Sequence, residues 1–283
     1  MRLGQIKADG GYLAAVFEGD LARPVPGYTL ADLIRRSEVE GVSLGKTAAR
    51  LASHHAEPHL PALPIVPPEV WACGCTYQPS ASFRDAEHGT PQGMYAYVYN
   101  QPRPEIFFKG TARVCVGPGG PIGIRADSQF TAPEPELALV LGGKGDIVGY
   151  TLANDVSAWD IERENPLYLP QSKIYTACCA LGPVIVTAGD LPDPYNLEIT
   201  CTVTRDGQQR FSGSVSTAQL HRKFETLIEY LRRANPTPAG TVLLTGTGII
   251  VPENAALAPG DIVTIHVPEI GELTNYAQIV GAP

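Results

Sequence analysis

A proline-rich stretch near residue 60 constrains the fold of this chain more than any other feature. The segment EPHLPALPIVPPEV carries five prolines, at positions 58, 61, 64, 67 and 68. Proline fixes φ and lacks a backbone N–H, so this much proline blocks both a helix and a central strand. We therefore expect an extended, semi-rigid connector here. It predicts a small domain at residues 1–65 and a larger domain at residues 66–283.

The N-terminal part predicts a small α+β unit. Residues 2–7 and 12–18 have the pattern of two strands, and the Asp-Gly-Gly sequence between them is a hairpin signal. Two short helices are expected at residues 29–38 and 46–54.

The larger part predicts a β-rich domain of α+β class with one clear helix. Short apolar runs bounded by turn residues predict strands at residues 70–75, 137–141, 184–187, 197–204 and 261–267. An Arg-Asp-Gly-Gln sequence at residues 205–208 indicates a hairpin turn. An apolar stripe from Leu220 to Leu231 predicts an amphipathic helix over residues 217–234. The domain as a whole is expected to be mixed α+β.

Composition narrows the class of protein. With 44% hydrophobic and 18% charged residues, the chain has the makeup of a globular protein. Its net charge of −8 argues against nucleic-acid partners and anionic membrane surfaces, and no apolar run has the length of a bilayer span. Six cysteines, two of them adjacent at Cys178 and Cys179, fit buried reduced thiols in the cytoplasm better than a disulfide framework.

Two glutamates flank a proline where the chain enters the apolar run LALVLGG. In a strand, side chains two residues apart share a face, so Glu134 and Glu136 would stand about 6–7 Å apart at their Cα atoms. Like charges this close repel one another when buried, and a bound cation reverses the sign of that effect. The pair therefore indicates either two ligands of a hard divalent metal or a solvated strand end.

Further polar residues are expected to gather around this pair. Glycines between Glu136 and Asp155 predict a turn that would bring Asp155 to the same end as the glutamates; the alternative is an Asn-Asp turn cap. Lys173 follows in ENPLYLPQSKIY. The glycines of LLTGTGII, at residues 243–250, would let backbone N–H groups approach an anionic ligand closely.

Taken together, the spaced motifs PEPELALVL, GYTLANDVSAWD, LGP, LLTGTGI, LAPGDIVTI and IGELTN resemble the fumarylacetoacetate hydrolase family over about residues 66–283. The resemblance implies a mixed β-roll and sandwich domain whose mouth holds Mg²⁺, with Mn²⁺ or Ca²⁺ as alternatives. It implies that Glu134, Glu136 and Asp155 are the metal ligands. It also implies a homodimer or homotetramer and a small-molecule 2-oxo acid as substrate.

A narrower resemblance is carried by IRADSQFTAPEPELALV, RPEIFFKGT and DIERENPLYLPQSKIY, which are similar to the 2-keto-3-deoxy-D-arabinonate dehydratase subfamily. It implies that Lys173 is catalytic and that Glu105 lies near the substrate. The alternatives are a surface lysine and an ordinary strand-end carboxylate. Thr247, Arg84 and Tyr77 are the candidates for substrate binding. For Thr247 the alternative is a tight structural turn.

The sequence departs from the pattern of the family's C–C bond hydrolases. These carry N-Y-x-x-H-x-x-E, and here the corresponding segment is GCTYQPSASFRDAE. Ser80 and Ala81 stand where the histidine is expected, Thr76 replaces the asparagine, and His88 beside Glu87 does not fit the spacing. Without the His–Glu pair, water activation has no obvious agent, which disfavours hydrolysis.

Two departures from the dehydratase pattern bear on the substrate. Trp159 stands where the resemblance leads us to expect arginine, and it cannot supply that charge. Residues 78–94 diverge, and we expect this loop to act as a lid over the site.

We therefore expect a metal-dependent lyase that dehydrates a 2-keto-3-deoxy sugar acid through a metal-stabilised enolate. Lys173 would transfer the proton at C3, as a base or through a Schiff base, and Glu105 would assist the leaving C4 hydroxyl. The alternatives are a C–C hydrolase of the acylpyruvate or fumarylpyruvate type, an oxaloacetate-type decarboxylase, and a non-catalytic metal-binding protein.

Overall fold

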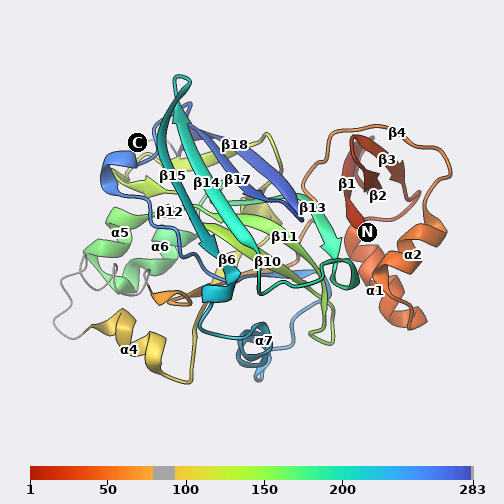
Figure 1. The fold of residues 1–283 in the computed structure, drawn as a ribbon, viewed down its shortest axis with the longest axis horizontal. Coiled ribbons are helices and arrows are strands. Elements are labelled where there is room, and N and C mark those ends of the chain that lie inside the picture. Colours follow the sequence, from red (N-terminus) through yellow and green to blue (C-terminus); the bar gives the residue numbers. More distant parts are fainter. Residues whose placement is uncertain (79–92, 282–283) are drawn as a thin grey trace.

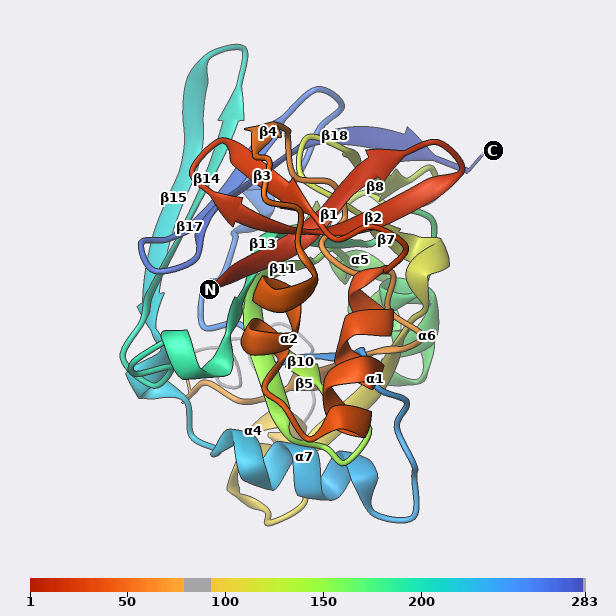
Figure 2. The same ribbon diagram turned by 90° about the vertical axis from the view of Figure 1, so that its right-hand side faces the viewer.

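Two β-sheets form the body of the protein in a computed structural model, which describes residues 1–78 and 93–281 (Figures 1 and 2). The strands of the larger sheet are β1 (Arg2–Ala8), β2 (Gly11–Glu18), β3 (Leu21–Pro24), β4 (Glu57–Pro58), β5 (Val70–Gly74), β6 (Glu105–Gly110), β7 (Cys115–Val116), β10 (Pro135–Leu141), β11 (Ile147–Asp155), β13 (Cys179–Thr187) and β16 (Thr241–Leu244). Their order is β4-β3-β2-β1-β13-β11-β10-β16-β5-β6, with β7 paired to β13.

The second sheet packs across the first. Its strands, in spatial order, are β15 (Gln208–Ser216), β14 (Glu198–Arg205), β17 (Ile262–Val267), β18 (Gly271–Val280) and β8 (Pro121–Arg125). β14 and β15 form the predicted hairpin, with Arg205 opposite Gln208. A small ribbon of β9 (Thr131–Ala132) and β12 (Ser157–Ala158) lies beside the two sheets. The β-rich α+β class predicted from the sequence is confirmed.

The N-terminal strands extend the larger sheet. β1 and β2 form the predicted hairpin, and β1 also pairs with β13, with Arg2 opposite Val186. Helix α1 (Leu30–Glu40) begins at a capping box of Thr29 and Asp32, and α2 (Leu44–Leu51) follows it. Both predicted helices are therefore present, within a few residues of the expected bounds. The division of the chain at residue 65 stays a prediction, because the sheet runs through both parts.

Burial on both faces explains why β10 is a continuous apolar run. Leu137, Leu139 and Leu141 pack in the core between the two sheets. Ala138 and Val140 point the other way and pack with residues of α1 and α2. Successive side chains in a strand alternate between faces, so a strand covered on both sides has no solvent-facing position.

The predicted helix at residues 217–234 is shorter than expected. A 3₁₀ turn occupies Thr217–Gln219, and α7 begins only at Phe224 and ends at Arg232. The intervening backbone is used elsewhere, because the His221 N–H donates to the Thr76 carbonyl. The Arg222 guanidinium donates to four backbone carbonyls between residues 98 and 102. These contacts are not local, so the apolar stripe alone could not predict the break.

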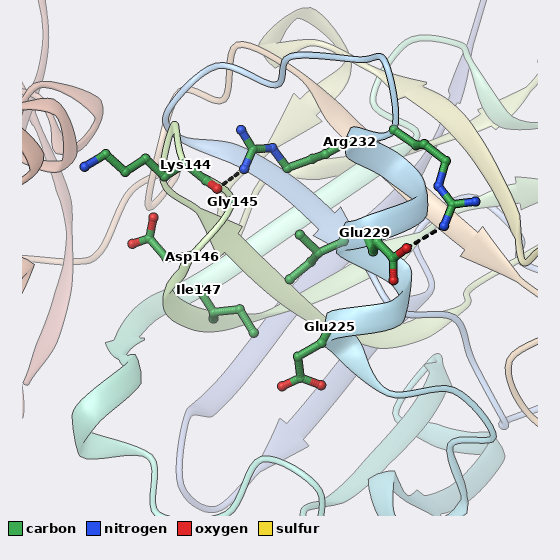
Figure 3. A pocket seen from close by; sticks show the side chains of 9 residues that line it. Lys144, Gly145, Asp146, Ile147, Glu225, Glu229 and Arg232 are labelled. Atoms are coloured by element: carbon green, nitrogen blue, oxygen red, sulfur yellow. Dashed lines mark hydrogen bonds and ion pairs between the residues drawn. The ribbon is translucent and has the colours of Figure 1, made fainter.

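Helix α7 and the turn between β10 and β11 border a hollow of about 650 Å³ (Figure 3). Arg232 reaches the turn and donates to the carbonyls of Gly143 and Lys144. Among the described residues, the remaining α-helices are α4 (Met94–Asn100), α5 (Trp159–Glu164) and α6 (Leu169–Lys173), and α5 and α6 lie beside β12 (Figure 1).

The cysteines and the lengths of the helices bear on two further expectations from the sequence. None of the six cysteines forms a disulfide, and five of them are buried. Within residues 1–78 and 93–281, no helix combines the length and the apolar character needed to cross a bilayer.

Candidate metal centre and active site

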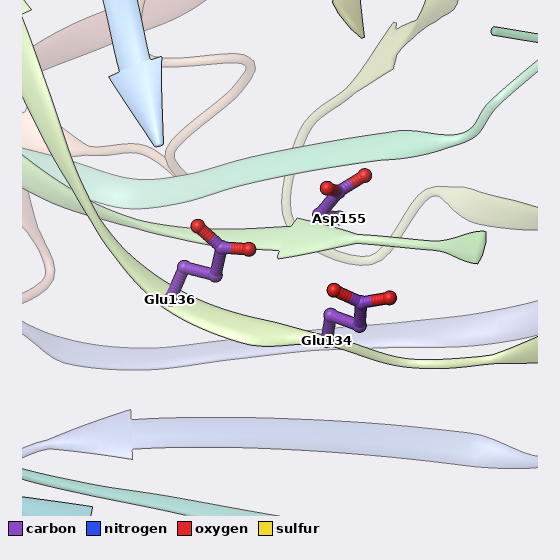
Figure 4. Close-up of side chains that lie close together, drawn as sticks. All are labelled: Glu134, Glu136 and Asp155. Atoms are coloured by element: carbon purple, nitrogen blue, oxygen red, sulfur yellow. The ribbon is translucent and has the colours of Figure 1, made fainter. Parts of the chain in front are cut away.

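The β10–β11 hairpin brings three carboxylates together. The two strands are antiparallel, with Pro135 opposite Asn154 and Glu136 opposite Ala153. Just before β10, the Glu134 carbonyl accepts a hydrogen bond of 2.9 Å from the Asp155 N–H. One oxygen from each of Glu134, Glu136 and Asp155 lies within 4.8 Å of the others, and the three side chains converge in Figure 4. The predicted turn therefore places Asp155 beside the glutamates, as the sequence analysis expected.

All three carboxylates are buried, with exposures of 1–2%. Burial raises the pKa of Glu136 well above its ordinary value, and the charges of Asp155 and Glu134 raise it further. A backbone N–H from Gly246 donates to Oε2 of Glu136 and opposes this shift. The solvated strand end considered for the E-x-E pair is thus wrong. In the glycine-rich segment at residues 243–250, the Gly246 N–H does bind an anionic group, but that group is the Glu136 carboxylate of the same chain.

Lys173 lies within this cluster. It is the last residue of α6, and its side chain is 1% exposed. Its Nζ donates to Glu134 Oε1 at 2.8 Å and to Asp155 Oδ2 at 3.2 Å. A third hydrogen bond, of 2.5 Å, runs to the hydroxyl of Ser157. The alternative of a surface lysine is wrong, and the ammonium bridges two of the three carboxylates.

Lys109 is a second buried lysine, which the sequence analysis did not single out. It lies on β6, is fully buried, and places Nζ 2.5 Å from Asp155 Oδ1 and 3.0 Å from the Val156 carbonyl. Burial, the largest single influence, lowers the pKa of Lys109, but the charge of Asp155, the neighbouring Cys178 and Cys179 and the hydrogen bond to Asp155 together outweigh it, so the net shift is upward. A signal was available, because Glu105, Phe107 and Lys109 share one face of β6 by the strand period of two.

Trp159 also contacts the cluster. Its indole Nε1 donates to Glu134 Oε1 at 2.7 Å, so that oxygen accepts from both Trp159 and Lys173. The residue that departs from the expected arginine is therefore part of the site. It supplies a hydrogen bond to the carboxylate and no charge.

The donor set fits a hard divalent cation. Three carboxylates and two ammonium groups sum to a formal charge of −1, all within the interior. An uncompensated buried charge destabilises the folded protein. A dication held by the carboxylate oxygens would supply the compensating positive charge. Oxygen ligands at this density suit Mg²⁺, Mn²⁺ or Ca²⁺. Glu134, Glu136 and Asp155 are the residues that would hold such an ion.

Glu105 lies farther along the β6 face that carries Lys109. Between them, the Phe107 ring centroid is 5.5 Å from Lys173 Nζ, so this face looks onto the cluster. Glu105 Oε2 accepts from the Cys75 thiol at 3.3 Å and rests against Gly74. A hollow of about 630 Å³ borders Glu105 and is lined by α4, by residues 101–105 that follow it, and by Pro166, Leu169 and Tyr230.

The three substrate-binding candidates have different outcomes. Thr247 is 5% exposed, and its hydroxyl bonds with the backbone of Ile249, as in a structural turn. Tyr77 is buried, and its hydroxyl has no hydrogen-bond partner among the described residues. Burial, together with the charge of Glu136, raises the pKa of Tyr77. Arg84 lies outside the described residues, as do Ser80, Ala81, Glu87, His88 and most of the expected lid. The roles of these residues stay predictions.

The hollow in Figure 3 is not part of this site. It lies at the turn end of the β10–β11 hairpin, and none of the three clustered carboxylates lines it. Asp155 is eight residues along β11 from Ile147, a separation of roughly 26 Å at the usual rise per residue.

Several known proteins are similar to this chain. A 2-dehydro-3-deoxy-D-arabinonate dehydratase of Saccharolobus solfataricus is 51% identical over 214 residues, which cover 74% of this chain and 72% of the relative. A probable 2-keto-3-deoxyxylonate dehydratase of Haloferax volcanii is 41% identical over 263 residues, or 89% of each chain. Among solved structures, a 2-keto-3-deoxy-D-arabinonate dehydratase complexed with magnesium and 2,5-dioxopentanoate superposes with a TM-score of 0.83, at 39% identity and full coverage of both chains.

The family itself is identified by its sequence profile. The profile described as fumarylacetoacetate (FAA) hydrolase C-terminal matches residues 81–278, which include every carboxylate and lysine of the buried cluster. The match covers well over half of the chain, and the solved relative shares the fold across its whole length. The chain belongs to the fumarylacetoacetate hydrolase family.

Proposed function

We propose that this protein is a magnesium-dependent hydro-lyase that removes water from a 2-keto-3-deoxy sugar acid. The observation that carries the proposal is the buried cluster of Glu134, Glu136 and Asp155 with Lys173 at hydrogen-bond distance. The similarity to an arabinonate dehydratase at 51% identity supports the same reaction class. The absence of the hydrolases' His–Glu pair from its expected positions in the sequence supports elimination over hydrolysis.

The three carboxylates would hold the cation at the end of the hairpin. When bound, a divalent ion supplies a Lewis acid at the C2 oxygen of a 2-oxo acid, where negative charge develops as the C3 proton leaves. The chain's own contribution is a rigid, buried arrangement of ligands. Asp155 is fixed by Lys109 and Glu136 by the Gly246 N–H, so both carboxylates are oriented before any ligand arrives.

Lys173 is the proposed proton-transfer group. In the elimination, the C3–H bond breaks, its proton passes to Nζ of Lys173 in its unprotonated form, and its electron pair forms the C2–C3 double bond of an enolate. The C2 carbonyl then re-forms as the C3–C4 double bond forms and the C4–O bond breaks, and the leaving hydroxide takes a proton from Glu105 and departs as water. For a five-carbon substrate, a proton shift from C5 to C3 then gives a C4–C5 enol, and movement of its hydroxyl proton to C4 gives a dioxo acid. Ser157 holds the Lys173 side chain in place for these transfers.

Glu105 is the proposed donor to the leaving hydroxyl. It lies on the β6 face that looks onto Lys173, two residues from Phe107, and so about 6–7 Å farther along the strand. A substrate whose C1 and C2 lie at the carboxylate cluster would extend toward Glu105 with its C4 and C5 atoms. The neighbouring hollow of about 630 Å³ gives room for the far end of a sugar acid.

Product analysis tests the proposal. The protein is incubated with Mg²⁺ and 2-keto-3-deoxy-D-arabinonate and followed by ¹³C NMR, with an EDTA-treated sample as control. We expect stoichiometric conversion to 2,5-dioxopentanoate, lost on chelation and restored by Mg²⁺. Two acid products would identify a hydrolase, and release of CO₂ a decarboxylase. Mg²⁺ binding without turnover of any 2-keto-3-deoxy acid would identify a non-catalytic metal-binding protein.

We also infer a reducing compartment, the cytoplasm, and a homodimer or homotetramer. The presence of six cysteines without a disulfide supports the first inference. The family resemblance supports the second. Light scattering on the purified protein measures the oligomer directly, and a monomeric mass would contradict it.

A further inference from the structure

Trp159 links the carboxylate cluster to a packed group of side chains behind it. Its backbone N–H donates to the Phe130 carbonyl at 2.8 Å, and the two rings lie 5.4 Å apart. The Arg163 guanidinium, one helical turn later, lies 4.7 Å from the Phe130 ring centroid and 6.0 Å from that of Trp159. Arg163 in turn contacts the Glu253 carboxylate at 3.2 Å. The indole is 6% exposed and is therefore held on its faces and along its backbone.

This support fixes the direction of the indole N–H. The N–H meets Glu134 Oε1 at 2.7 Å, and Lys173 Nζ meets the same oxygen at 2.8 Å. A carboxylate is planar, so two donors on one oxygen restrict its rotation and set the direction of the whole group. Metal affinity depends on such orientation, because a ligand that must reorient loses part of its binding free energy.

The indole donor is also neutral, which matters for the charge of the site. The three carboxylates and two lysines sum to −1, and the N–H of Trp159 leaves that sum unchanged. A cationic donor at the same place would bring the sum to zero and reduce the attraction for a dication. Trp159 therefore orients a ligand without lowering the negative charge that draws the metal.

We propose that Trp159 is a positioning residue of the metal centre, whose indole N–H holds Glu134 in the orientation that binds a divalent cation. The inference rests on the proposed function, because it requires that the cluster binds a metal. It goes beyond that function in assigning a role to a side chain that is neither a ligand nor a proton-transfer group.

The chain offers a matched control in its second tryptophan. Trp71 also donates its indole N–H to a glutamate, Glu69 Oε2, at 2.9 Å, and its ring packs edge-on against Phe108 at 5.3 Å. It is partly exposed and its partner is not one of the clustered carboxylates. Trp159→Phe and Trp71→Phe each remove one indole–carboxylate bond and keep an aromatic ring, so they differ chiefly in which carboxylate loses a donor.

Calorimetric titration with Mg²⁺ is the first test, on wild type, Trp159→Phe and Trp71→Phe, with thermal unfolding as a check on folding. We expect Trp159→Phe to bind Mg²⁺ about 10- to 100-fold more weakly, the usual effect of losing an outer partner of a ligand. Trp71→Phe should match wild type. Equal affinity of Trp159→Phe and wild type would overturn this inference alone. A wild-type protein that binds no divalent cation would overturn the proposed function with it.

A second measurement does not depend on the folding of Trp159→Phe. The chain has two tryptophans, so Trp71→Phe leaves Trp159 as the single indole. Its emission should change saturably on addition of Mg²⁺, with the same midpoint as the calorimetric titration, because the indole shares Glu134 with the ion. Emission that stays constant while calorimetry shows binding would contradict the proposal.

Discussion

The two ends of the β10–β11 hairpin treat charge in opposite ways. At one end, Glu134, Glu136 and Asp155 are almost completely buried and have two buried lysines beside them. At the other end, the turn carries the exposed Lys144 and Asp146, close to exposed charged residues of α7 (Figure 3). The turn end borders a hollow, and the other end carries the carboxylate cluster. Only at the cluster are charged groups removed from water.

This difference indicates that the buried end, and not the turn, is the functional one. Exposed charges are solvated and contribute little to stability, so the turn needs no ligand. Buried like charges destabilise a fold unless something compensates them, and the lysines at the buried end leave a net −1. Substitutions at the two ends should therefore differ in their effects on stability, metal binding and turnover.

The largest effect is expected for Asp155→Asn. The change removes a ligand and leaves Lys109 buried beside a neutral amide, which should cost about 3–5 kcal/mol in the free energy of unfolding. Mg²⁺ binding and turnover should disappear. Asp146→Asn, at the exposed end of the same hairpin, should lie within about 0.5 kcal/mol of wild type. Urea denaturation measures both, and equal losses would remove the contrast.

Lys173→Met should separate catalysis from metal binding. Because Lys173 is proposed to move a proton and not to hold the ion, turnover should fall by about 10²- to 10⁴-fold while Mg²⁺ still binds. The variant should gain more thermal stability from Mg²⁺ than wild type does, because its carboxylates have lost a cation. Lys144→Met is the control at the turn and should keep full activity. Substantial turnover by Lys173→Met would exclude its role as the proton-transfer group.

Gly74→Ala tests how far the buried end extends. A Cβ at this position would lie 2.1 Å from Glu105 Oε2, so the glutamate side chain must move while the backbone keeps its conformation. We expect kcat to fall by about 10²-fold through misplacement of Glu105, with Mg²⁺ affinity unchanged. If steady-state kinetics show normal kcat, Glu105 lies outside the reacting part of the site.

The smallest effect is expected for Glu229→Gln. Glu229 on α7 pairs with Arg233, the residue that follows the helix, and both side chains are more than half exposed. The change should alter unfolding by no more than about 0.5 kcal/mol and leave turnover as in wild type. A loss of activity would show that the hollow at the turn takes part in the function.

Local patterns predicted the cluster of three carboxylates and not its surroundings. The strand period and the glycine turn were enough to place Glu134, Glu136 and Asp155 together, because both act within one hairpin. Lys109 comes from β6, which is separated from β10 by β16 and β5 in the sheet, and no local pattern connects it with Asp155. The strand period predicts that Lys109 lies on the same face of β6 as Glu105 and Phe107, but it does not predict the contact with Asp155.

Long-range contacts also account for the features of the fold that the sequence did not predict. The break before α7 depends on Arg222 and His221 meeting backbone groups more than a hundred residues away. The pairing of β1 with β13 likewise joins segments that the proline-rich connector separates in sequence. Trp159 was noted as a departure from the family pattern, and its bond to Glu134 follows only from the packing of α5 against β9, the short strand that precedes Glu134.

The proposed function depends on Glu134, Glu136 and Asp155 forming a metal centre. Glu136→Gln tests this with least disturbance, because the amide keeps the shape of the side chain and removes only its charge. Electron paramagnetic resonance of Mn²⁺ counts bound ions in folded wild-type and variant protein. We expect one tightly bound Mn²⁺ per wild-type chain and none in Glu136→Gln, and equal binding by the two proteins would show that these carboxylates do not form a metal centre.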